Sequence, residues 1–123
     1  MNPPGDPSHA AQAPLPRFAV ELAPPDIACW LAGNTGVPGF TSHAAAEPGP
    51  HVMVIGLTHG NELAGGIVVD QLLRAGLRPA RGRLTLGFAN LAAFARFDPA
   101  HPTASRFVDE DFNRLWDRAT LDG

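Results

Sequence analysis

The chain has 123 residues and a formal net charge of −3, from twelve acidic and nine basic side chains. This length suits one modest domain, no basic cluster points to nucleic acid as a partner, and no apolar run approaches the roughly 20 residues that span a bilayer. The single cysteine, Cys29, excludes an intramolecular disulfide framework and favours a reducing, cytoplasmic location.

The first third of the chain offers little to bury. Residues 1–16 are rich in Pro and Ala, and we expect them to form a flexible tail. We assign residues 17–123 to the N-terminal portion of a single α/β domain. Residues 18–22 are expected to form a short strand, Asp26 to cap a short helix, and residues 40–45 to form an edge strand.

A strand-helix-strand pattern follows. Residues 51–57 are almost continuously apolar, which predicts a strand covered on both faces, as in mainly parallel sheets. Apolar spacing predicts a helix over residues 63–75 with Asn61 as its N-cap, and residues 83–89 predict a second strand. The two strands should be parallel neighbours, because a helical crossover joins them.

Polar residues follow both predicted strands. His59 and Glu62 come after the first and Asn90 after the second. Ligands bind outside the carboxyl ends of the strands in open parallel sheets, so we expect the three to meet at one edge. An imidazole and a carboxylate three residues apart are ligands that zinc accepts, and Gly60 lets the backbone turn tightly between them. A capping or packing role for the histidine stays open.

A catalytic zinc usually takes three protein ligands, and this sequence offers two good ones. Among the other histidines only His101 is expected near the site. It lies between prolines in a predicted loop, where an exposed side chain is the simpler interpretation. We therefore expect the third ligand to be missing from this chain.

A second polar block spans residues 106–114 and contains two arginines and an asparagine, which suit an anionic substrate. Every basic residue of the chain is arginine, so any carboxylate-binding cation has planar, bidentate geometry. We expect residues 109–116 to begin a helix, with Phe112 and Trp116 in the core. Pairing of Arg114 with an acidic neighbour on that helix is the structural alternative.

Two segments of the chain resemble a known family. Residues 56–63, Gly-Leu-Thr-His-Gly-Asn-Glu-Leu, and residues 106–114, ending in Asp-Phe-Asn-Arg, resemble the motifs of the succinylglutamate desuccinylase and aspartoacylase family. Asn90 matches an asparagine that follows the second strand, and we place it on the substrate side of the site. The resemblance covers about residues 50–117. It implies the N-terminal part of a zinc-carboxypeptidase-like fold, with a mixed, mainly parallel sheet flanked by helices.

The resemblance also implies roles for individual residues. His59 and Glu62 would be the first two zinc ligands. Arg106 matches an arginine that holds the reacting carbonyl or its oxyanion. Asn113 and Arg114 match residues that grip a substrate carboxylate. The aspartate of this block, Asp111, is expected to orient its neighbours and not to react.

The implied activity is that of a zinc-dependent hydrolase, which cleaves the amide bond of a small anionic N-acyl amino acid. The third zinc ligand and the general base of the family lie in later blocks that this chain lacks. We therefore expect a truncated catalytic domain that is inactive alone. A zinc carboxypeptidase-type peptidase and a non-catalytic binding fragment are the alternatives. The sequence indicates neither the acyl group, nor the amino acid, nor the oligomeric state.

Overall fold

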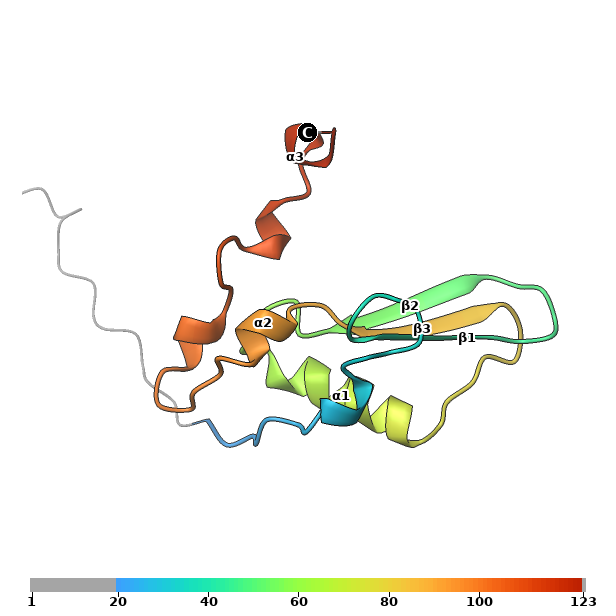
Figure 1. Cartoon of the computed structure of the whole chain (residues 1–123), viewed down its shortest axis with the longest axis horizontal. Helices are drawn as coiled ribbons and strands as arrows, with labels where there is room; N and C mark the ends of the chain where they lie inside the picture. Colours follow the sequence, from blue (N-terminus) through green and yellow to red (C-terminus); the bar gives the residue numbers. More distant parts are fainter. Residues whose placement is uncertain (1–19, 123) are drawn as a thin grey trace, which may run out of the picture.

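The structure is a computed structural model, and it describes residues 20–122. Within them, three strands form one sheet in the order β1-β3-β2, and helix α1 packs against one face (Figure 1). The strands are β1 (Phe40–Ala44), β2 (His51–Gly56) and β3 (Arg83–Phe88), and α1 spans Leu63–Arg74. β1 is antiparallel to β3, whereas β2 is parallel to it. The predicted α/β class and the parallel crossover are confirmed.

The remaining elements are short. They are η2 (Ala28–Trp30), α2 (Leu91–Phe94), η3 (Pro102–Ser105), η4 (Phe112–Arg114) and α3 (Arg118–Asp122). After α2 the chain runs outward from the sheet, and α3 lies at the far end of this excursion (Figure 1). None of the helices between residues 20 and 122 has the length and apolar character that crossing a bilayer demands.

Two expectations concern the first residues. The predicted tail at residues 1–16 lies outside the described residues, as does part of the predicted strand at residues 18–22. Residues 20–22 form no strand. Asp26 does act as a local cap, because its Oδ1 accepts a hydrogen bond from the backbone N–H of Ala28 at 3.1 Å.

The predicted helix over residues 109–116 is wrong. Asp111 has extended backbone angles, and its side chain accepts a hydrogen bond from the Asn113 N–H, which limits the helical part to the single turn η4. Phe112 and Trp116 are not in the core either, since they are 40% and 74% exposed. The hydrogen bond between the Asp111 side chain and the Asn113 N–H therefore outweighs the helical tendency of the surrounding residues.

The core lies between α1 and β3. Phe88, Leu57 and Val69 are at most 1% exposed, and Leu86 and Ile27 complete the cluster. Full burial of side chains of this size contributes about 2 kcal/mol each. The alternation of β3 decides which residues enter this core, because successive side chains of a strand point to opposite faces.

β2 is an edge strand, and the prediction that both its faces are covered is wrong for the described residues. Every residue from His51 to Ile55 is exposed, and Val52 and Met53 are 50% and 51% exposed. Within residues 20–122, α1 lies over one face only, and β3 is the only strand that pairs with β2. The apolar run at residues 51–57 therefore predicted the strand correctly, but it did not predict which elements cover its faces.

A buried carboxylate ties α1 to the segment before β1. Asp70 accepts a hydrogen bond from Trp30 Nε1 at 2.8 Å and from Arg74 Nε at 2.9 and 3.0 Å. The same arginine donates through Nη2 to the Asp26 carbonyl at 2.9 Å. This contact fixes η2 on the helix, and no spacing rule predicts it, because Trp30 and Asp70 are 40 residues apart.

α1 approaches the end of β2 closely because both contribute glycine at the contact. A Cβ added to Gly56 would lie 2.7 Å from the Gly65 carbonyl oxygen and 3.1 Å from the Gly66 nitrogen. Backbone therefore packs directly on backbone, and the turn that joins β2 to α1 is held within a narrow space.

We predict that Gly56→Ala destabilises the protein by about 1–3 kcal/mol, because its methyl group would overlap the α1 backbone. Gly65→Ala is the matched control from the other side of the contact. Its Cβ would meet the nearest atom at 3.6 Å, an ordinary contact, and alanine favours a helix. Urea unfolding midpoints measure both variants. An equal loss in the two would contradict the close approach.

Candidate functional site

The turn between β2 and α1 carries the candidate site. Leu57 follows the strand with a φ of 57°, a left-handed conformation that costs a non-glycine residue about 1–2 kcal/mol. Its side chain is 1% exposed in the core, and its carbonyl accepts a hydrogen bond from the Asn90 N–H at 2.8 Å. These interactions hold the strained residue, which redirects the chain toward His59. Leucine gives no sequence signal for such a turn.

Helix α1 begins at Leu63, as predicted, but its N-cap residue differs from the predicted one. Glu62, not Asn61, is the N-cap residue, and its side chain makes no capping hydrogen bond within the described residues. The Glu62 N–H instead donates to the His59 carbonyl at 3.2 Å, which closes the turn. The Glu62 carboxylate is therefore available to face the imidazole of His59.

Gly60 is required by close packing. A Cβ at this position would lie 2.3 Å from the Ser105 carbonyl oxygen and 2.4 Å from the Ala93 carbonyl carbon. The Gly60 N–H donates to the Arg106 carbonyl at 3.0 Å. The turn thus rests directly on the segment that begins the second motif, which brings the two motifs together.

Four side chains form a continuous row across the two motifs. His59 is 4% exposed and makes contacts through both ring nitrogens. Nδ1 faces Oε1 of Glu62, and Nε2 lies 2.7 Å from Oδ1 of Asp111. Arg106 donates to Oδ2 of the same aspartate through Nε at 3.3 Å and Nη2 at 3.2 Å. Asp111 therefore joins His59 to Arg106, and these are the neighbours that the orienting role would concern.

The protonation of this row follows from its contacts. The hydrogen bond from His59 lowers the pKa of Asp111 to about 2, helped by the Asn113 N–H and Arg106. An ionised Asp111 only accepts, so His59 Nε2 must carry a proton. The hydrogen bonds to Asp111 and then to Glu62 raise the pKa of His59 above its ordinary 6.5, while burial opposes the rise.

The contact between His59 Nδ1 and Glu62 Oε1 depends on what lies between the two atoms. With the Nε2 position protonated, a neutral imidazole directs the lone pair of Nδ1 at a carboxylate oxygen, and two acceptors repel each other. A proton or a metal ion between them removes this repulsion. The donor set of one imidazole nitrogen and one carboxylate oxygen is one that zinc accepts.

The predicted substrate-binding residues Asn90, Asn113 and Arg114 are not members of this row. Asn90 is 5% exposed, and its Oδ1 accepts a hydrogen bond from the Ala93 N–H at 3.1 Å, which caps α2. Asn113 and Arg114 are exposed on η4, directly after Asp111. Arg114 donates to the Asn113 carbonyl at 3.0 Å and makes no ion pair among the described residues, contrary to the structural alternative.

His101 takes no part in this row. It is exposed and pairs with Asp98, whose Oδ2 lies 3.2 Å from its Nδ1. Between residues 20 and 122, no group of three or more His, Cys, Asp or Glu side chains is arranged to hold a metal ion. The zinc prediction therefore rests on two possible ligands that lie side by side, His59 and Glu62.

We predict that Asp111→Asn lowers the pKa of His59, because an amide does not stabilise the imidazolium charge as a carboxylate does. The stabilisation from the raised pKa is present below pH 6.5 and is lost as pH rises through the folded-state pKa. This acid-side stabilisation should shrink in the variant. NMR titration of the His59 ring measures the pKa directly.

Asp109→Asn is the matched control, because it makes the same chemical change at an exposed residue two positions away. It should leave the His59 titration unchanged. Equal effects of the two substitutions would show that general charge, and not the hydrogen bond to Asp111, sets the pKa of His59.

The sequence of this chain is similar to those of known proteins. The model of the succinylglutamate desuccinylase/aspartoacylase catalytic domain matches residues 48–122. Aspartoacylases of Mus musculus and Rattus norvegicus are 35% and 33% identical over 82 residues, and each alignment covers 67% of this chain. The aligned part is 25% of each relative, so the chain spans about a quarter of their length. No solved structure gives a significant match. The chain therefore belongs to the succinylglutamate desuccinylase/aspartoacylase family, as its two motifs predicted.

Proposed function

We propose that this chain supplies the first two zinc ligands and the anion-binding arginines of a hydrolase that acts on small N-acyl amino acids. The supporting observation is that His59 Nδ1 and Glu62 Oε1, two atoms that can bind zinc, face each other across the turn. Two relatives carry the name aspartoacylase, which indicates an acylated aspartate as their substrate. An acyl amino acid of this kind is the substrate class that we assign here.

His59 and Glu62 would hold the zinc ion. Bound zinc supplies a water whose pKa falls to about 7, and it polarises a carbonyl group. Asp111 accepts the hydrogen bond from His59 Nε2, which leaves Nδ1 as the coordinating nitrogen and fixes the ring. We propose that the further ligand and the general base come from outside residues 20–122.

The two arginines of the second motif would bind oxygen atoms of the substrate. Arg106 donates to Asp111 through Nε and Nη2, and these hydrogen bonds fix its guanidinium beside the row. Its Nη1 is left to donate to the substrate's carbonyl oxygen or to the oxyanion that forms from it. Arg114 and Asn113 lie on the exposed turn that follows, where a bidentate arginine suits a substrate carboxylate. Asn90 would offer the substrate its amide nitrogen, since its oxygen already caps α2.

We predict that His59→Ala and Glu62→Ala each weaken zinc binding by the chain at least about tenfold, and that Asp111→Asn weakens it about 10–100-fold. Isothermal titration with zinc chloride measures these affinities without any activity. His101→Ala is the control, since this exposed histidine lies outside the row. An equal loss in His101→Ala and His59→Ala would remove the metal assignment.

We predict that Arg114→Lys leaves the zinc affinity unchanged and weakens binding of an N-acyl aspartate about tenfold, because lysine cannot form the bidentate pair. NMR titration of the zinc-loaded chain with the acyl amino acid provides the measurement. A change in zinc affinity in this variant would instead place Arg114 in the metal site.

A non-catalytic anion or metal binder is the second candidate. The observation in its favour is that residues 20–122 present two metal donors and no group of three. Turnover discriminates the candidates. A hydrolase releases free amine from a small acyl amino acid in the presence of zinc, a peptidase prefers dipeptides, and a binder releases neither product.

A further inference from the structure

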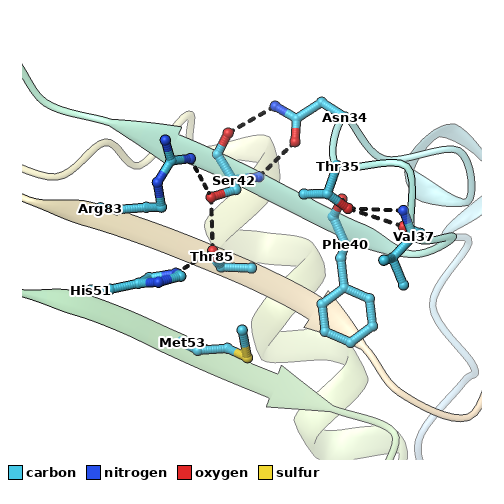
Figure 2. Close-up of a pocket in the computed structure, with 9 residues that line it drawn as sticks. All are labelled: Asn34, Thr35, Val37, Phe40, Ser42, His51, Met53, Arg83 and Thr85. Atoms are coloured by element: carbon cyan, nitrogen blue, oxygen red, sulfur yellow. Dashed lines mark hydrogen bonds between the residues drawn. The ribbon is translucent and has the colours of Figure 1, made fainter.

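The sheet face opposite α1 carries a hollow that the proposed hydrolase chemistry does not use. It has a volume of about 530 Å³ and is lined by all three strands and the loop before β1 (Figure 2). His51, at the start of β2, lies in its wall, whereas His59 follows the other end of that strand. The five residue steps along β2, from His51 to Gly56, correspond to about 17 Å.

One wall of the hollow is a chain of hydrogen bonds that crosses the sheet. His51 Nε2 lies 2.7 Å from Thr85 Oγ1, and that hydroxyl donates to Ser42 Oγ at 2.8 Å. Arg83 Nη1 donates to the same Ser42 oxygen at 2.8 Å. These side chains point into one space from β2, β3 and β1 (Figure 2). Register explains the meeting, because Thr85 pairs with Ser42 on one side and Met53 on the other.

The side chains of this wall have hydrogen-bond donors that the hydrogen bonds within the wall do not use. Thr85 uses its only hydroxyl hydrogen in the hydrogen bond that it donates to Ser42. It can therefore only accept in its contact with His51, so His51 Nε2 carries the hydrogen of that bond. Ser42 Oγ accepts two hydrogen bonds, which leaves its own proton for a further acceptor. Arg83 has five N–H donors, and the bond to Ser42 uses one of them.

The wall also carries an uncompensated positive charge. Among residues 20–122, no carboxylate lies within 4.0 Å of the Arg83 guanidinium, and no acidic residue lines the hollow. The backbone beneath is rigid, because Asn34 accepts from the Ser42 N–H at 2.7 Å and donates to its carbonyl at 2.8 Å. The Ser42 hydroxyl therefore projects from a backbone position that two hydrogen bonds fix.

The opposite side of the hollow is apolar. The Phe40 ring lies across β3, close enough that a Cβ on Gly87 would be 2.3 Å from one of its atoms. Met53 and Val37 are 51% and 54% exposed and border the same space. A rigid aromatic floor beside a row of donors suits a ligand with an anionic head and an apolar body.

We propose that this hollow binds a small organic carboxylate. The carboxylate accepts hydrogen bonds from Arg83 and from the free Ser42 hydroxyl, and the apolar body lies between Phe40 and Met53. Arginine recognises carboxylates through paired, charge-assisted hydrogen bonds, so the cation is the main determinant of affinity. The site is separate from the row formed by Glu62, His59 and Asp111.

Benzoate is the probe, and benzamide is its neutral match. NMR titration of the 123-residue chain should show saturable benzoate-dependent shifts of the His51 ring and Arg83 side chain. Benzamide and acetate should each bind about tenfold more weakly, because one lacks the charge and the other lacks the apolar body. His59→Ala should leave benzoate binding unchanged, which separates this test from the proposed zinc chemistry.

Arg83→Gln should weaken benzoate binding at least about tenfold, and the matched Arg81→Gln, an exposed arginine outside the hollow, should not. Ser42→Ala removes the spare hydroxyl and should weaken binding while leaving Arg83 in place, and circular dichroism checks the fold of each variant. Equal binding of benzamide, equal effects of the two arginine variants, or benzoate shifts confined to His59 would each overturn the proposal. Binding of a carboxylate-bearing peptide but not of benzoate would overturn the small-ligand assignment.

Discussion

The hydrogen bond between His59 Nε2 and Asp111 Oδ1 is the contact on which the candidate site depends. It joins the turn after β2 to a segment that otherwise leaves the sheet, and it does so between a buried imidazole and an aspartate that Arg106 also holds. Because the bond fixes which nitrogen carries the proton, it determines the chemistry at Nδ1 as well as the position of the ring. The metal-ligand role proposed for His59 and the orienting role proposed for Asp111 would both depend on this one interaction.

The sheet and helix supply the rigidity that this bond requires. The backbone contact at Gly56 and the packing beneath Gly60 leave the turn little room to move. The strained Leu57 is held by core burial on one side and by Asn90 on the other. Strain of this kind persists where surrounding contacts over-determine it, which is common next to functional groups. The turn therefore positions His59 and Glu62 in a preorganised arrangement.

The sequence was informative where structure is local. Apolar periodicity predicted β2, α1 and β3 within a residue or two, and the two motifs predicted the family. It failed where the outcome depends on distant partners. The exposure of β2 is set by what lies beside it, and the contact between His59 and Asp111 joins residues 52 positions apart. The Arg83 hollow combines three strands, so no single segment of the sequence indicates it. The individual roles of the site residues stay predictions.

The free edge of β2 has a consequence for how the protein behaves at high concentration. From Val52 to Ile55 the strand carries no charge and no proline, and its outer backbone groups have no strand partner within residues 20–122. Natural sheets usually protect such an edge with lysine, proline or a bulge, because unpaired amides recruit other extended chains. Colloidal stability of this chain should therefore be governed by these four residues more than by its net charge.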